Sequence, residues 1–369
     1  MIKGLMLTPP VVGRISIGRT VERQGRRLPE KDDEFTLTTQ VQTRSGWALH
    51  PLDGVLRAEL QERALMASGM DVKELSGADA QKPRLRRKES PETAPPSSSS
   101  AMAHTKLRSI PVRLLFNDPG LNLRASYTLF DRATARPLCV GDGQHCKRVT
   151  HTGVESLPCP GPDYCTVGIE GGCKLFGRFN VCIDHPENQG DAFSTFVLRT
   201  TGVNTVRTLM ARMRYLQAVS GGLLAYLPLE LRLRGKSTAQ SHRAPIYYVD
   251  LCVRTPLDLG VAIVQAREAA QRAQVAGLDR AALEQAAREG YAQGLFEETE
   301  EDASAVVQEF YPPGGQDGQE PSAGGQPQWN EHEARPASMA GLSTCLNDRM
   351  EQVMRTPAGV SPPSGTSHG

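Results

Sequence analysis

Six of the eight cysteines of this chain lie between Cys139 and Cys182, in a stretch rich in glycine and proline. Turn-rich sequence lets thiols that are distant along the chain meet at one point, where thiolates bind zinc or form disulfides. Which of the two happens determines both the cellular compartment and the organisation of the middle of the chain.

The start of the chain favours a reducing compartment. Residues 1–7 run directly into Thr8-Pro9-Pro10, without an apolar core of signal-peptide length or a cleavage site. No stretch approaches the roughly 18 uncharged apolar residues of a membrane span. We therefore expect a cytoplasmic protein that makes no membrane contact. Clustered cysteines in such a compartment more often hold a metal than form a disulfide. The sequence thus favours a structural Zn²⁺ over reduced, metal-free thiols and over disulfides.

The spacing Cys159-x5-Cys165-x7-Cys173 supplies three metal ligands from one compact segment. Tetrahedral zinc needs a fourth ligand. The candidates are Cys139 first, Cys146 as its alternative, and His145 or His151 as substitutes. A site with four cysteines leaves no open position for water, so it would stabilise the surrounding loops without doing chemistry.

Composition and periodicity divide the chain into five parts. These are a strand-rich N-terminal segment (1–70) that packs with the core, a flexible linker (71–105), a core (106–256), a helical appendage (257–296) and a disordered tail (297–369). The core contains the cysteine-rich zinc loop (139–182) and a basic segment (199–243).

Strand patterns outnumber helical ones in the ordered parts. Strands are expected at 11–18, 35–39, 110–116, 123–130, 179–183, 193–199, 229–234 and 246–253, and helices at 56–70, 204–219 and either side of a break near Gly277. Asn204 is expected to cap the central helix, and loops are expected from Cys139 to Cys173. Cys182 lies in a strand-like run and is interpreted as a small core residue. Because the strands and helices do not alternate regularly, we predict an α+β fold. Its core is an antiparallel sheet or small barrel with an inserted zinc-binding loop region, one central helix, a C-terminal helical pair, and a disordered linker and tail.

The basic segment carries eight basic residues and a single acid, Glu230. Arginines accompanied by small polar groups suit contacts to a phosphate backbone, to an acidic protein, or simply to solvent. Pairing with acids elsewhere, such as the run at 297–302, is the plain alternative. The predicted contact residues are Arg199, Asn204, Arg207, Arg214, Arg232, Arg234, Lys236 and Arg243.

The sequence offers little support for catalysis. Ser237 and His242 lie near Asp250, but no nucleophile-elbow pattern surrounds them. The glycines near the cysteines do not precede a phosphate-binding Gly-Lys-Ser/Thr turn. The run Asp32-Asp33-Glu34 is typical of a solvated face. We predict no catalytic residues and no small-molecule substrate.

Several motifs together carry a family resemblance. They are the glycine-bounded strand Gly13–Gly18, the run Leu28–Thr38, Cys159-Pro160-x-Pro162-x2-Cys165, Cys173-x3-Gly177-Arg178, and Arg199-Thr200-Thr201-Gly202-x-Asn204-Thr205-x-Arg207. The chain resembles the recombination directionality factors of large serine integrases, over about 1–56 and 106–296. It is similar in particular to a bacterial mobile-element branch often labelled "hydrolase or metal-binding protein".

The resemblance implies an accessory protein, encoded by a phage or integrative element, that binds a serine integrase and converts integration into excision. It implies that DNA is contacted weakly or through the integrase. Together with the residues, it predicts a bacterial, zinc-stabilised, non-enzymatic factor. The alternatives are a zinc-containing nucleic-acid-binding protein without a recombinase partner, which steep salt dependence would favour, and a metal-dependent hydrolase, which needs an open metal position.

Overall fold

The computed structural model describes residues 9–23, 26–43, 46–67, 106–188, 193–237, 244–293, 306–307 and 310. These residues all belong to one compact unit, 1–322. The predicted linker and most of the predicted tail lie outside the described residues. The prediction of a tail disordered from residue 297 is wrong at its start, because Val306 and Val307 are buried in a cluster with Phe130 and Phe176. No helix in the described part is long and apolar enough to cross a membrane.

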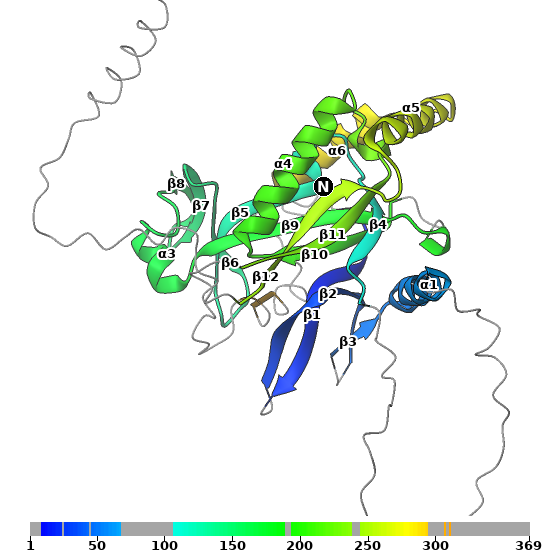
Figure 1. Cartoon of the computed structure of the whole chain (residues 1–369). Helices are drawn as coiled ribbons and strands as arrows, with labels where there is room; N and C mark the ends of the chain where they lie inside the picture. Colours follow the sequence, from blue (N-terminus) through cyan, green and yellow to red (C-terminus); the bar gives the residue numbers. More distant parts are fainter. Residues whose placement is uncertain are drawn as a thin grey trace, which may run out of the picture. The chain divides into compact units, whose positions relative to one another are not determined.

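The described strands form one large mixed sheet of twelve strands, which is open rather than closed into a barrel (Figure 1). The main path of neighbouring strands is β3-β2-β1-β10-β9-β5-β6-β7-β8. A branch leaves it where β4 pairs with both β9 and β11, and β12 continues from β11. The strands are β1 (Val11–Arg23), β2 (Arg26–Thr43), β3 (Gly46–Leu49), β4 (Ser109–Arg113), β5 (Leu123–Phe130), β6 (Pro137–Gly141), β7 (His145–Thr150), β8 (Gly153–Pro158), β9 (Lys174–Ile183), β10 (Thr195–Thr200), β11 (Leu229–Lys236) and β12 (Ile246–Val253).

The helices lie against this sheet and at its ends. They are α1 (Pro51–Ala67), α2 (Pro119–Asn122), α3 (Thr166–Gly171), α4 (Val203–Val219), α5 (Leu259–Val275) and α6 (Arg280–Gln293), with short 3-10 turns at Pro186–Asn188 (η2) and Leu224–Tyr226 (η3). The predicted central helix is therefore present as α4 and the predicted helical pair as α5 and α6.

A row of apolar side chains across the middle strands builds the core. Leu123 lies opposite Phe179, which lies opposite Leu198, then Ile15, then Leu37. Directly opposed residues share one face of a sheet. All five are at most 2% exposed, and α4 adds its own apolar stripe to the same core. The alternation read from the sequence thus identifies the buried face correctly.

Two local expectations need correction. The predicted purely antiparallel sheet contains one parallel pairing among the described strands, β1 with β10. The strand expected at 35–39 is longer than predicted, because β2 also includes the polar run 29–34 before it. Ion pairs explain its polarity: Lys106 and Arg108 pair with Asp33, and Arg57 pairs with Glu34 at 2.6 Å.

The helix break expected near Gly277 is confirmed, but the cap expected at Asn204 of the central helix is wrong. Asp258 caps α5, and its Oδ1 accepts a hydrogen bond from the Val261 amide at 2.8 Å. Gly277 lies in the short connection between α5 and α6, with φ +82°. At α4 the cap position falls on Gly202. Asn204 lies inside the first turn, where its Oδ1 accepts from Lys236 Nζ at 2.8 Å.

Candidate metal centre and contact surface

The cysteine-rich region is an arm made of β6, β7, β8 and α3, residues 137–173. It lies at the end of the sheet path, and Figure 1 shows β7, β8 and α3 together at one edge. The prediction of loops from Cys139 to Cys173 is wrong for this arm, because three short antiparallel strands and a helical turn fill it. Short strands broken by glycines and prolines give a weak two-residue periodicity, which hides them in the sequence.

Strand pairing brings the first thiols together. Cys139 lies opposite Arg148, and Gly141 lies opposite Cys146, so these four residues share one face of the β6–β7 pair. Leu157 of β8 lies opposite Cys146. Cys139, Cys146, Cys159 and Cys173 belong to one small apolar cluster that also contains Leu129, Leu138 and Leu157.

Two glycines leave the space in which Cys159, Cys165 and Cys173 lie close to the other cysteines. A Cβ at Gly141 would lie 2.8 Å from Cys159 Sγ, so only glycine leaves room for that thiol. A Cβ at Gly168 would lie 3.1 Å from Cys165 Cβ and 3.2 Å from Cys173 Cβ, because both cysteines close on the same turn of α3. The Cys173 amide donates to the Gly168 carbonyl at 2.7 Å. Cys139 and Cys146 come from β6 and β7, and the other three cysteines come from the loops that flank β8 and α3, so five cysteines lie close together in the arm.

Arg148 is the cation of this cluster, and only the pairing of β7 with β6 reveals its place there. Its Nη2 donates to Cys165 Sγ at 3.4 Å. A hydrogen bond with Cys139, together with the charges of Cys139 and Cys165, raises the pKa of Arg148 above its ordinary value. Arg148 thus places a positive charge beside the sulfur of Cys165.

Burial opposes ionisation of the other thiols. Burial raises the pKa of Cys146 to about 11, with a further contribution from Cys139. Burial also raises the pKa of Cys173 to about 12, and the charges of Cys139 and Cys159 add to it. Burial therefore disfavours the thiolate form of these two side chains.

The described side chains do not form the coordination geometry of a metal site. No group of three or more His, Cys, Asp or Glu in the described part of the chain meets the arrangement of a metal site. The seven cysteines of this part are free thiols. Of the substitute ligands, His145 faces the opposite side of β7 from Cys146, and His151 lies in the exposed turn before β8. Cys182 lies in a separate apolar cluster with Leu115, Phe116 and Leu121, as a core residue would.

A substitution tests how tightly the arm is built. Gly141→Ala is expected to destabilise the protein by about 1–3 kcal/mol, because the new methyl group overlaps Cys159 Sγ and Cys146 Cβ. Urea unfolding measures the change. Gly54→Ala in α1 is the matched control: nothing lies within 4 Å of its Cβ, and alanine favours helix by up to about 1 kcal/mol. Equal stability of the two variants would contradict the packing described for the arm.

The predicted basic surface divides into separate groups. Arg199 of β10 lies opposite Arg178 of β9, which lies opposite Arg124 of β5. These three arginines share the face of the sheet opposite Phe179 and the core, whereas α4 packs on the core side, where Val206 contacts Gly177. Arg199 therefore lies on the other face of the sheet from Arg207 and Arg214.

Two acids neutralise much of the strand part of this segment. Asp250 is 3% exposed and accepts from Arg212 Nε at 2.9 Å and Arg234 Nε at 3.3 Å. Glu230, 6% exposed, pairs with Arg232. Arg212 and Arg234 thus pair with an acid outside the basic segment, and Arg232 pairs with the one acid inside it. Arg243 and His242 lie outside the described residues.

The Asp250 pair predicts a pH dependence. Burial by itself raises the pKa of Asp250, but hydrogen bonds from Arg212 and Cys252 and the Arg212 charge lower it by more, so the net pKa lies below the ordinary value. A depressed pKa stabilises the fold above the unfolded-state pKa of about 4 and loses that contribution as pH falls through the folded-state value. Asp250→Asn is expected to cost about 1–3 kcal/mol at pH 7 and less at pH 3, measured by urea unfolding at both values. An equal cost at both would contradict the ion pair's contribution.

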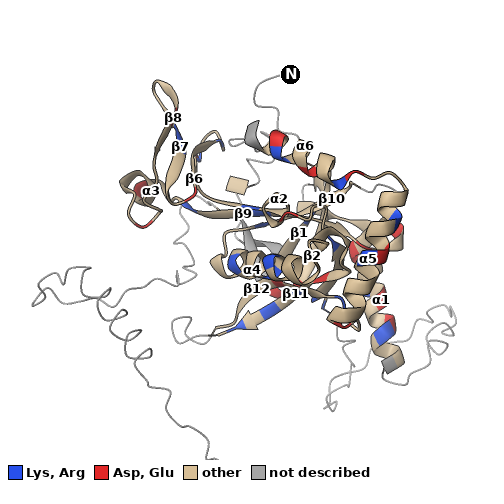
Figure 2. Cartoon of the chain, turned by 90° about the horizontal axis from the view of Figure 1, so that it is seen from above, with Lys and Arg blue, Asp and Glu red and all other residues tan. Residues whose placement is uncertain are grey.

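The arginines on the outer face of α4 are exposed and can contact a partner. Arg207 and Arg214 are exposed and form no ion pair with another described residue, and Figure 2 shows basic segments along this helix. Tyr215 is 71% exposed beside them, and Val203 is 42% exposed at the start of the helix. Tyr215 is not among the predicted contact residues, although its position off the apolar stripe of α4 indicates an exposed aromatic side chain. Exposed tyrosine and arginine together are typical of protein interfaces.

Comparison with known proteins agrees with the resemblance read from the sequence. A Gp3-like family described as recombination directionality factor-like matches residues 12–254, which span β1 to the end of β12 and include the cysteine arm and α4. No curated protein and no solved structure shows significant similarity to the chain. The family match covers well over half of the chain, and the chain therefore belongs to the recombination directionality factor-like family.

Proposed function

We propose that this protein is an accessory factor that binds a serine integrase and promotes excision in site-specific recombination. Membership of the family implies an accessory role in site-specific recombination, and members are in general non-catalytic. The observation that carries the finer proposal is the outer face of α4. Arg207, Arg214 and Tyr215 are exposed there together, inside the family region and without another described element over them.

The mixed chemistry of this face favours a protein as its first partner. Two arginines alone suit phosphates, but a tyrosine that is 71% exposed and a valine that is 42% exposed add apolar area that a phosphate backbone does not use. Arg232 and Arg234, which the sequence assigned to the same surface, already pair with Glu230 and Asp250. DNA would then be contacted through the integrase.

We further propose that the arm holds a structural Zn²⁺ through Cys139, Cys159, Cys165 and Cys173, with Cys146 as the alternative to Cys139. Five convergent thiols offer the soft ligands that zinc prefers. Arg148 would donate to the Cys165 sulfur and offset the negative charge of four thiolates. A metal here would fix the arm and would leave no position for substrate.

Binding of the purified integrase from the same mobile element tests the proposed partner. Calorimetric titration of the full chain into the integrase is expected to give saturable binding that Arg207→Glu weakens. No binding to the integrase, together with binding to arbitrary duplex DNA that falls steeply with salt, would replace this proposal with the nucleic-acid-binding function.

A further inference from the structure

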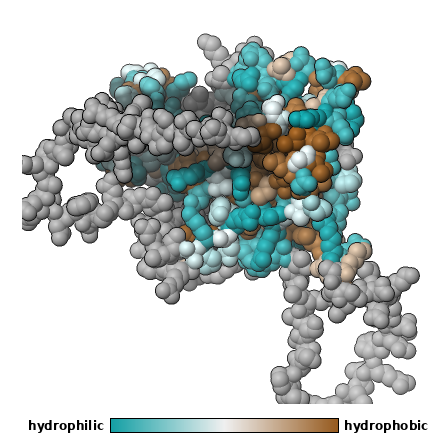
Figure 3. Space-filling model, turned by 45° about the horizontal axis from the view of Figure 1, so that its top comes forward, coloured by the Kyte–Doolittle hydropathy of each residue, from teal (hydrophilic) through white to brown (hydrophobic). Residues whose placement is uncertain are grey.

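Helix α5 has an exposed face that the family region does not account for. The family match ends at residue 254, and α5 begins at Leu259. Its inner side is made of small residues, with Ala262 and Ala266 fully buried, and contacts the turn η3. On its outer side Val261, Val264 and Val275 are 43%, 53% and 85% exposed. Figure 3 shows apolar surface on the side of the molecule that carries α4, α5 and α6.

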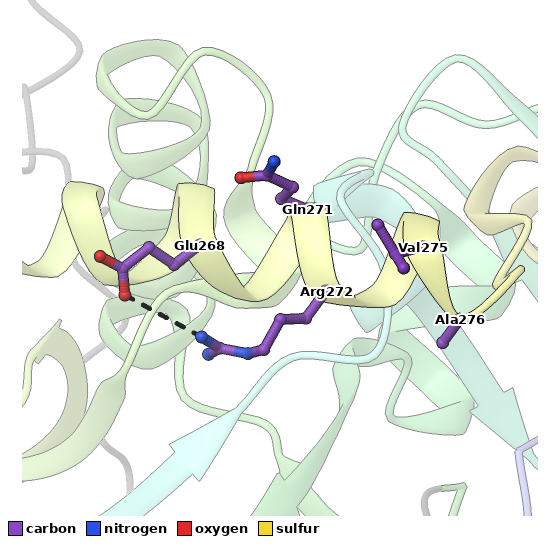
Figure 4. A pocket seen from close by; sticks show the side chains of 5 residues that line it. All are labelled: Glu268, Gln271, Arg272, Val275 and Ala276. Carbon is purple, nitrogen blue, oxygen red and sulfur yellow. Dashed lines mark ion pairs between the residues drawn. The ribbon is translucent and has the colours of Figure 1, made fainter.

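The outer residues have the spacing of a coiled-coil seam. The seam consists of Val261, Val264, Glu268, Gln271 and Val275, followed just after the helix by Leu278, which is 40% exposed. Steps of three and four residues place all of these on one side of a helix. Figure 4 shows the second half of α5, whose residues Glu268, Gln271, Arg272, Val275 and Ala276 line an open hollow of about 480 Å³.

The seam is complementary to the seam of a second copy that runs in the antiparallel direction. If two copies pair antiparallel, one register places Val264 against Val275 of the second copy and Val261 against its Leu278. The same register places Glu268 against Gln271 of the second copy, so a carboxylate faces an amide that can donate to it. A two-fold axis requires this reciprocity, in which each contact occurs twice.

The charges beside the seam agree with this register. Arg272 lies 3.9 Å from Glu268 within one helix, an exposed and loose pair. In the antiparallel pair the basic residues Arg267 and Arg272 flank the two carboxylates at the centre. Two polar positions in an otherwise apolar seam cost stability but specify one register.

We propose that α5 is a self-association helix through which two copies of this protein pair antiparallel. The occupant of the exposed face is a second copy of this chain. A single 17-residue helix buries less than the roughly 800 Å² per partner of a standard interface. The dimer is therefore reversible and forms at micromolar concentration. Pairing brings a second α4 surface into the assembly. The pairing helix α5 lies outside the family region, and its self-association is independent of the function proposed above.

Sedimentation of the full chain from about 1 to 100 µM tests the proposal. A monomer–dimer equilibrium is expected, and Val264→Glu with Val275→Glu is expected to weaken it at least tenfold. Val154→Glu, at an equally exposed valine of β8 (57%), is the matched control and should leave the equilibrium unchanged.

A charge change at one position tests the register itself. Gln271→Lys places an ammonium against Glu268 of the second copy and is expected to tighten the dimer several-fold at low salt, whereas Gln271→Glu is expected to weaken it. A protein that stays monomeric over the whole range would overturn the proposal. So would a dimer insensitive to the valine pair, or equal effects of the two Gln271 variants. A monomer whose valine variants lose integrase binding would assign the face to the integrase instead.

Discussion

Arg207→Glu combined with Arg214→Glu is expected to abolish the stimulation of excision while the protein stays folded. Both side chains are exposed on α4 and have no described ion-pair partner to lose. Exposed substitutions of this kind change stability by about 0.5 kcal/mol or less. Central interface arginines commonly contribute 2 kcal/mol or more each, so the double variant should lose at least about 100-fold in affinity. Integrase titration and thermal unfolding measure the two quantities.

The control for this pair is Arg132→Glu, a charge reversal at an exposed arginine in the turn after β5. It should retain integrase binding, because this turn lies outside both the α4 surface and the α5 seam. A double variant that binds integrase as well as the wild type does would exclude the outer face of α4 as the contact surface. A control that loses binding equally would show a general effect of net charge instead.

Cys165→Ser is expected to remove the bound metal and loosen the arm. Four thiolates bind zinc far more strongly than three thiolates and a hydroxyl, so zinc per chain should fall from about one to near zero. Because Cys165 precedes α3 and also accepts from Arg148, the arm should then exchange its amide hydrogens faster. Elemental analysis of protein purified without chelator and hydrogen exchange of residues 137–173 measure both effects.

Cys252→Ser is the matched control for the thiol. Cys252 lies in β12, outside the arm, and donates to Asp250 at 3.4 Å, a bond that a serine hydroxyl can replace. It should keep its zinc. Wild-type protein without zinc, or a Cys165→Ser variant with unchanged zinc and unchanged exchange, would refute the metal centre.

The periodic elements could be predicted from the sequence. The stripe of α4 and the alternation of β5 and β11 each follow from local repeats of apolar residues, since one element buries one face. The caps at Asp258 and Gly277 are local as well. The cap at α4 was misplaced because Asn204 and Gly202 both suit a helix start, and Asn204 instead accepts from Lys236, 32 residues away.

The candidate sites depended on pairings that lie far apart in sequence. The thiols could be grouped from their spacing, but Arg148 joins them only through the pairing of β6 with β7. The basic segment could not be divided from sequence alone. Two long-range facts divide it. Asp250 forms ion pairs with Arg212 and Arg234, and strand alternation places Arg199 on the face of the sheet opposite the one that α4 covers.

The most direct measurement is a reconstituted recombination reaction. The serine integrase encoded on the same element is supplied with attL and attR substrates, with and without the purified, metal-replete protein. The account predicts that excision products form only when the protein is present, and that Arg207→Glu with Arg214→Glu removes this effect. Unchanged excision in the presence of folded, zinc-loaded protein would contradict the proposed role as a factor that promotes excision.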